Sequence, residues 1–145
     1  AIATGIAYLD KAATGIKLTE YHLQAGIAAE HAKAKSFTQT NWKQIIEYYD
    51  MLGEINNSPI VTLNRAVAYA MYVSPQEALK QVDGLTAHPQ INRYYLYHAV
   101  RADLLRRDNE WSKAISAYAR AIGLVSNDVE RKYLERRIAE CRAQI

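Results

Sequence analysis

Apolar residues recur along this chain at positions i, i+3, i+4 and i+7, the spacing that places them on one face of an α-helix. No stretch alternates between apolar and polar residues as a half-buried strand would. Proline and glycine are scarce, and they divide the chain into segments of about 12 to 18 residues. We therefore expect seven or eight helices, at about 2–14, 20–36, 41–54, 59–72, 75–86, 92–107, 110–124 and 128–143.

Several of these helices begin with capping signals. Ser58 and Ser74 each precede a proline, and a serine side chain can accept a hydrogen bond from an unpaired N–H of the first turn. Glu77 stands three residues after Ser74, as in a capping box. The other expected caps are Asn127, which precedes Glu130 by three residues, and Thr40 and Asn109, which precede Trp42 and Trp111 by two.

The helical pattern also repeats. Three segments, Trp42–Tyr49, Pro75–Val82 and Trp111–Tyr118, superpose with their apolar positions in register, and their starts are 33 and 36 residues apart. A helix rich in small residues precedes each segment, which lets neighbouring helices approach closely. Tetratricopeptide repeats have this pattern, with a helix pair about every 34 residues. We expect an all-α fold, a tetratricopeptide-like right-handed stack of antiparallel helix hairpins in which Trp and Tyr serve inter-helix packing.

The composition is that of a soluble globular protein, with 50% hydrophobic and 23% charged residues. No apolar run reaches the roughly 18 residues of a membrane span, and the N-terminus has neither a basic leader nor an initiator Met. Cys141 is the only cysteine, which excludes an internal disulfide and a thiolate metal cluster. We therefore expect a cytoplasmic chain that belongs to a larger protein.

The net charge of +3 arises in the last third of the chain. Residues 101–145 carry 10 Lys/Arg and 7 Asp/Glu, whereas the first 100 residues carry 8 of each. A basic end can mark contact with nucleic acid or an acidic partner. The interleaved acidic residues favour a solvated helix face with salt bridges instead. The basic residues expected on the outside of the last helix are Arg131, Lys132, Arg136, Arg137 and Arg142.

Recognisable catalytic patterns are missing from the sequence. The four histidines include no H-x-x-x-H pair, and the chain has no nucleophile elbow or glycine-rich phosphate loop. His98 lies on an apolar helix face and is expected to be a hydrogen-bonded core or groove histidine. Cys141 is expected to be a packing residue. We expect no enzyme activity, no cofactor and no metal site.

A partner surface is the remaining candidate, because the first helix of each hairpin lines the inner groove of such a stack. Arginine there offers a planar fork of donors for a carboxylate, and asparagine can hold a peptide backbone. The partner-binding candidates are Asn64, Arg65, Tyr69, His98 and Arg101. Internal pairing is the alternative. It would join Arg101 to Asp103, Asp108 or Glu110, and would bond Asn64 within its own hairpin.

Several strings are specific enough to suggest a family. Tyr21–Ala32, Trp42–Asp50, Pro59–Ala68, Arg101–Arg107 and Asn127–Arg137 together resemble the C-terminal region of one family of bacterial RNA polymerase sigma factors. These are factors of the extracytoplasmic-function type that carry a C-terminal tetratricopeptide-like domain. Residues 1–17 look like the helix that joins this region to the preceding part.

The resemblance implies a domain organisation and a role. Residues 1–37 would form a helical hairpin joining to upstream sigma regions, and residues 38–145 about three degenerate repeats with a C-terminal capping helix, in one continuous domain. The chain would be a regulatory, protein-interaction module in transcription initiation that lacks the DNA-binding regions. Its partners would be the upstream sigma regions, RNA polymerase or another regulatory protein, with no direct DNA contact and no membrane. The alternative is a free-standing tetratricopeptide scaffold that binds a peptide or protein in its concave groove.

Overall fold

Each of the three matching segments begins an α-helix in the structure, a computed structural model that describes residues 20–33 and 40–145. These helices are α2 (Trp42–Ile55), α4 (Pro75–Asp83) and α6 (Trp111–Ile122). The other elements are a helix over residues 20–33, α3 (Pro59–Tyr72), two short 3₁₀ helices η2 (Gly84–Ala87) and η3 (Ile91–Arg93), α5 (Tyr95–Arg107) and α7 (Asp128–Arg142). The described residues contain seven α-helices and no strand, which confirms the all-helical prediction; the helix expected at 2–14 lies outside them.

The chain divides into two compact units, Ala1–Asn57 and Ser58–Ile145. The boundary expected at residue 37 falls within residues 34–39, outside the described residues, so it stays a prediction.

In the first unit, helix 20–33 packs against α2. A Cβ on Gly26 would stand 2.9 Å from the Tyr48 ring, and the His31 and Trp42 rings meet edge to face with their centroids 5.4 Å apart. Residue numbers rise along one helix as they fall along the other at these two contacts. The two helices are therefore antiparallel, as a hairpin requires.

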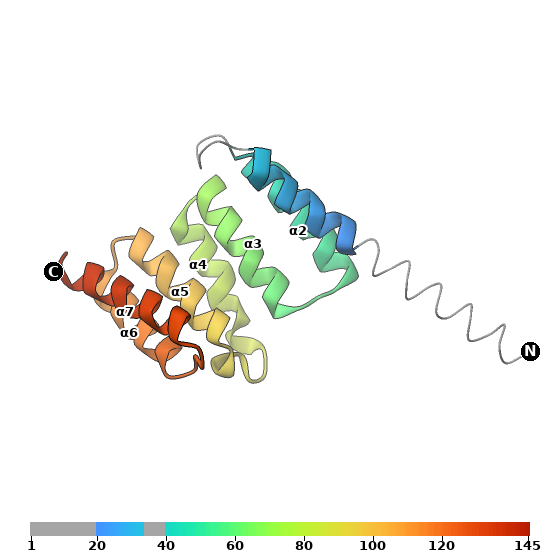
Figure 1. Cartoon of the computed structure of the whole chain (residues 1–145). Helices are drawn as coiled ribbons and strands as arrows, with labels where there is room; N and C mark the ends of the chain where they lie inside the picture. The colour runs from blue at the N-terminus through green and yellow to red at the C-terminus, as the bar shows by residue number, and fades with distance from the viewer. Residues whose placement is uncertain (1–19, 34–39) are drawn as a thin grey trace, which may run out of the picture. The chain divides into compact units, whose positions relative to one another are not determined.

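In the second unit, α3 to α7 lie side by side in chain order (Figure 1). Connections of two to five residues join α3 to α4, α5 to α6 and α6 to α7, and the segment with η2 and η3 joins α4 to α5. Each helix runs antiparallel to the one before. Two clusters of buried residues hold the row together. One joins α3, α4, η3 and α5 through Leu63, Ala66, Ala78, Val82 and Leu104, among others. The other joins α5, α6 and α7 through residues such as Ala102, Tyr118 and Leu134.

Helix α5 contributes to both clusters, and this explains its sequence. Tyr97–Val100 is a run of four buried residues, which a helix with one solvent-exposed face would not have. Alanines stand where neighbouring helices meet: Ala66, Ala78, Ala102 and Ala114 have no exposed surface. This confirms the expectation that small residues allow close helix approach.

Three of the expected caps are present. Ser58 Oγ accepts from Ile60 N–H at 3.1 Å, and Ser74 Oγ accepts from Glu77 N–H at 3.2 Å. The Asn127 side chain accepts from Glu130 N–H at 2.8 Å.

Two of the expected caps are wrong. Asn41, not Thr40, caps α2 by accepting from Gln44 N–H at 3.1 Å. Asn109 has a φ of 60°, a left-handed conformation that asparagine tolerates, and its N–H donates to Arg106 O at 3.0 Å. Asn109 therefore closes the end of α5, and α6 begins after Glu110 without a side-chain cap.

The expected helices 75–86 and 92–107 are each interrupted. Helix α4 ends at Asp83 and continues as η2, while η3 precedes a later start of α5 at Tyr95. Between the two 3₁₀ helices, Gln90 adopts a left-handed conformation with a φ of 69°, which an α-helix cannot contain. Both short elements contribute a residue to the wall of a pocket, Thr86 from η2 and Asn92 from η3.

Candidate functional site

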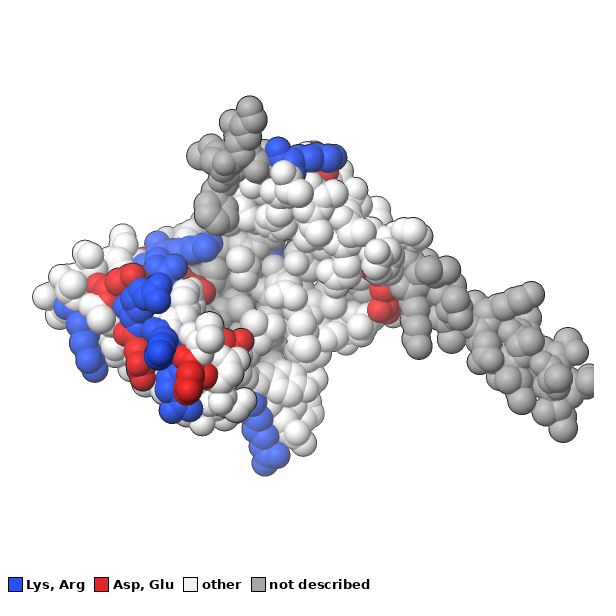
Figure 2. All heavy atoms as spheres, in the orientation of Figure 1, with Lys and Arg blue, Asp and Glu red and all other residues white. Residues whose placement is uncertain are grey.

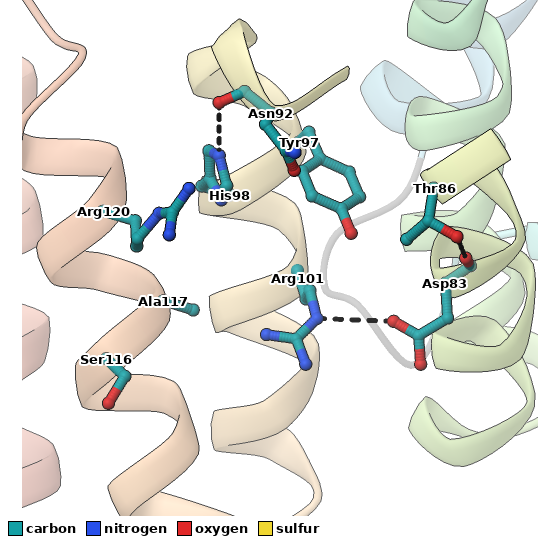
Figure 3. A pocket seen from close by; sticks show the side chains of 9 residues that line it. All are labelled: Asp83, Thr86, Asn92, Tyr97, His98, Arg101, Ser116, Ala117 and Arg120. Atoms are coloured by element: carbon teal, nitrogen blue, oxygen red, sulfur yellow. Dashed lines mark hydrogen bonds and ion pairs between the residues drawn. The ribbon is translucent and has the colours of Figure 1, made fainter. Parts of the chain in front are cut away.

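A pocket of about 630 Å³ opens in the second unit, between the C-terminal ends of α4 and α6. Figure 3 shows α5 between the two, with Tyr97, His98 and Arg101 on it. The other lining residues are Asp83 at the end of α4, Thr86 in η2, Asn92 in η3, and Ser116, Ala117 and Arg120 on α6. Because α4 and α6 both run antiparallel to α5, their last turns lie beside the first half of α5.

An ion pair between α5 and α4 forms part of the pocket wall. Arg101 Nε donates to Asp83 Oδ1 at 3.3 Å, and the two side chains are 33% and 56% exposed. The pair therefore lies at the solvent boundary, where its contribution to stability is small. Internal pairing of Arg101 is thus observed, but the expected partners Asp103, Asp108 and Glu110 are wrong. Asp103 is two residues away and faces another direction on the helix. Asp108 and Glu110 lie beyond the end of α5, where Asp108 accepts a hydrogen bond from Gln76.

His98 holds the 3₁₀ segment against α5. Its side chain is 6% exposed, and Nε2 lies 2.8 Å from the carbonyl oxygen of Asn92. A carbonyl can only accept, so Nε2 carries the hydrogen and donates. The expectation of a hydrogen-bonded core or groove histidine is confirmed, since His98 is buried and also lines the pocket.

The charged residues of the pocket affect the pKa of the Tyr97 phenol. Burial is the main cause that raises its pKa above the usual value. The positive charges of Arg101 and Arg120 lower this pKa, and the negative charge of Asp83 raises it. Arg120 extends from α6 toward α5 in Figure 3. Its guanidinium makes no ion pair or hydrogen bond within residues 20–33 and 40–145. The pocket thus contains one arginine that is paired and one that is not paired with any described residue.

The candidates on α3 lie elsewhere. Arg65 Nη1 donates to Gln81 Oε1 at 2.8 Å, and its guanidinium carbon stands 5.2 Å from the centre of the Tyr69 ring. Asn64 is half-buried on the same helix. None of these three residues lines the pocket. The structure therefore brings together His98 and Arg101 and separates them from the α3 group.

Asp83 and Arg120 have no motif around them. The one signal in the sequence that could have found them is the repeat register. When Pro75 is superposed on Trp111, Arg120 corresponds to Gly84, the residue directly after Asp83. Both residues therefore lie at the ends of second helices in consecutive repeats.

A second polar cluster, which the sequence did not reveal, joins α5, α6 and α7. The hydroxyl groups of Tyr118 and Tyr133 both donate to the Asp103 carboxylate, the second at 3.5 Å. Arg106 Nε donates to the Tyr118 hydroxyl oxygen at 3.1 Å. Arg137 Nε donates to Tyr133 at 3.2 Å. We call these five residues the Asp103 cluster.

Burial and the hydrogen bond to Asp103 raise the pKa of Tyr118 well above its usual range. Tyr118 has no exposed surface, so its hydroxyl is neutral and committed to its neighbours. The Asp103 cluster is internally satisfied and serves packing between helices rather than ligand binding.

The last helix, α7, presents its charges outward. Basic and acidic side chains alternate over this end of the second unit (Figure 2). Arg137 Nη1 pairs with Glu140 at 2.9 Å, and Arg131 donates to the carbonyl of Val125 at 3.2 Å. Arg131, Lys132, Arg136 and Arg142 are exposed and Arg137 is half-buried, so the expected basic outer face is present with its acidic residues interleaved.

Cys141 is free and has no exposed surface, and burial raises the pKa of its thiol. It is a packing residue, as expected. Within the part of the chain that the structure describes, no group of three or more His, Cys, Asp or Glu residues could hold a metal ion. None of the helices described there has both the length and the apolar composition to cross a membrane.

No protein-family model matches the chain. The chain is 36% identical over 143 residues to an uncharacterized protein of Rhizobium meliloti (strain 1021). The match covers 99% of this chain and 33% of that protein, so the chain spans a third of the length of the relative.

Proposed function

We propose that this chain is the C-terminal protein-interaction module of a bacterial sigma factor of the extracytoplasmic-function type. In this role it acts in the cytoplasm on the sigma regions that precede it or on RNA polymerase. It does not itself read DNA and does not catalyse a reaction. The observation that carries the proposal is the set of strings that resemble this family, which lie on helices of both units: helix 20–33, α2, α3, α5 and α7.

The positions of these strings support the proposal. Leu63 and Ala66 on α3, Leu104 on α5 and Leu134 on α7 belong to the resembling strings, and all four are buried in the core of the second unit. Residues that determine how such helices stack would be retained in any module built in this way. The polar residues of the same strings, such as Arg101, lie at the surface and are available to a partner.

The length of the relative also supports a modular role. Two thirds of the Rhizobium protein lies outside the match, which leaves room for further regions in a protein of that kind. A helical stack attached to such regions offers an extended surface for docking.

The test uses the protein that contains this chain. We expect the residues encoded before Ala1 to form two helical regions with a helix-turn-helix. We also expect deletion of residues 20–145 to change transcription by RNA polymerase core enzyme reconstituted with that protein. In a direct assay, the isolated upstream regions should shift the amide NMR signals of the isotope-labelled chain. The absence of a helix-turn-helix upstream, or equal transcription with and without the module, would refute the proposal.

One observation favours the second candidate function, a tetratricopeptide scaffold that binds a peptide. The pocket contains Arg101 and Arg120 together, in a position that an extended segment could reach from solvent. A scaffold of this kind would bind its peptide without any sigma region. If the protein that contains this chain has no sigma regions and the chain still binds a peptide, this candidate is favoured over the first.

A further inference from the structure

The charges that face the pocket leave an excess of one positive charge. Arg101 and Arg120 contribute two positive charges and Asp83 one negative charge, and no other lining residue carries a full charge when His98 is neutral. A single carboxylate would neutralise this excess. A phosphate dianion would overcompensate it and would be repelled by Asp83.

Arg101 is held in an orientation that leaves its best donors available. Only its Nε is bonded to Asp83, at 3.3 Å, and the terminal nitrogens make no contact of this kind with the described residues. Figure 3 shows these nitrogens on the side of the guanidinium away from Asp83. Asp83 therefore positions the fork of donors while Arg120 approaches from α6, and a carboxylate between the two can receive hydrogen bonds from both.

The remaining polar groups of the wall suit a peptide. Thr86 Oγ1 donates to the carbonyl of Asp83 at 2.9 Å, and Ser116 Oγ donates to the carbonyl of Ser112 at 3.3 Å. Each hydroxyl oxygen retains lone pairs that can accept an N–H. A peptide brings N–H donors to these oxygens, whereas inorganic phosphate brings mainly acceptors. The pocket thus offers donors for one carboxylate and acceptors for the amides around it.

We propose that this pocket binds an acidic peptide segment, with the carboxylate of one Glu or Asp side chain seated between Arg101 and Arg120. This inference rests on the proposed function in one respect, which is that the partner is a protein. It adds the place of docking, between α4 and α6, and the chemistry of the docked segment.

The test is an NMR titration of the isotope-labelled chain of residues 1–145. The probe is the pentapeptide Ala-Ala-Glu-Ala-Ala, acetylated and amidated so that glutamate supplies its only charge. We expect this peptide to shift the Nε–Hε signals of Arg101 and Arg120 and the amide signals near Ser116. The matched peptide with Gln in place of Glu should leave these signals unchanged. Equal shifts with both peptides, or none with either, would overturn the proposal.

Two variants sharpen the result. Arg120→Gln removes an exposed guanidinium and should weaken binding about tenfold or more, because hydrogen bonds to charged groups are among the strongest. Arg136→Gln, which removes the same charge from the exposed face of α7, is the control and should bind like the wild type. Equal losses in the two variants would mean that only the net charge of the chain matters, which would also overturn the proposal.

Inorganic phosphate tests the alternative that the pocket binds an inorganic anion. We expect it to bind the wild type more weakly than the glutamate peptide does and to gain affinity in Asp83→Asn, because that variant raises the excess charge of the pocket. Tighter binding of phosphate than of the peptide to the wild type would identify an inorganic anion site and refute the peptide assignment. Failure of peptide binding would leave the sigma-factor proposal standing, because that proposal is tested by the upstream sequence and by transcription.

Discussion

Replacing Tyr118 by phenylalanine removes one hydroxyl group from the Asp103 cluster and changes little else. The ring has no exposed surface, so Phe keeps its packing. The hydroxyl donates to Asp103 and accepts from Arg106 Nε at 3.1 Å, and both bonds are lost. We expect Tyr118→Phe to lower the free energy of unfolding of the second unit.

The magnitude follows from the partners. A hydrogen bond to a charged group contributes about 1.5 to 3 kcal/mol, and the loss is greatest when the remaining partner is buried. The side chains of Asp103 and Arg106 are 29% and 21% exposed, so water can partly replace the hydroxyl at both. We therefore expect a loss of about 2 kcal/mol at neutral pH.

The pH dependence provides a second, independent check. The pKa of Tyr118 is raised in the folded state, so its neutral form stabilises the fold fully below the pKa of an unfolded tyrosine, roughly 10. Above that pH the unfolded chain ionises while the folded one does not. The wild type then loses about 1.4 kcal/mol per pH unit from this residue, and the variant does not. The difference between the two should therefore shrink to below about 1 kcal/mol near pH 11.

Urea unfolding followed by far-ultraviolet circular dichroism at neutral pH and near pH 11 measures both quantities. Other tyrosines also titrate, but they are common to the two proteins and cancel in the difference. A loss under about 0.5 kcal/mol at neutral pH would show that the hydroxyl bonds add nothing to stability. A difference that stays constant up to pH 11 would show that Tyr118 is not protected from ionisation.

Four further predictions concern other parts of the chain. Ser74→Ala should destabilise the second unit by about 1 kcal/mol in urea unfolding, because α4 loses its N-cap, and Ser74→Asp should restore most of this. Gly53→Ala should stabilise α2 by about 0.5 to 1 kcal/mol, since nothing lies within 4 Å of the added methyl group. Gly26→Ala should be at least about 1 kcal/mol less favourable than Gly53→Ala, because its methyl group would stand 2.9 Å from Tyr48. Cys141 should react with a thiol reagent about 100-fold more slowly in buffer than in urea, because its thiol is buried and its pKa raised, and equal rates would contradict this burial.

Local signals in the sequence predict the helices well because they act over a few residues. Ser74 and Asn127 cap the predicted helices because a short polar side chain reaches the N–H three residues ahead. Asn109 shows the limit of this reasoning. The same residue type also favours a left-handed conformation at the end of a helix, and the sequence alone does not say which use prevails.

The candidate site depends on contacts between helices, which local signals do not contain. Helical spacing places His98 and Arg101 on one face of α5 and Arg65 and Tyr69 on one face of α3. Whether the two faces meet depends on how each helix is rotated in the stack. That rotation is determined by buried residues such as Leu104, which joins α5 to α3 and α4. For the same reason Asp83, distant from Arg101 in the sequence, could not be identified as its partner.

The Asp103 cluster has a consequence for how the stack responds to change. Repeat proteins usually behave as chains of separable units, in which one hairpin can open while its neighbours stay closed. Here a single carboxylate on α5 accepts hydrogen bonds from both α6 and α7, so opening the last helix also removes a partner from the first of the three. The amides of α5, α6 and α7 should then exchange with solvent as one cooperative block. Insertion or deletion of a hairpin within this block would therefore change the stability of the block as well as the length of the stack.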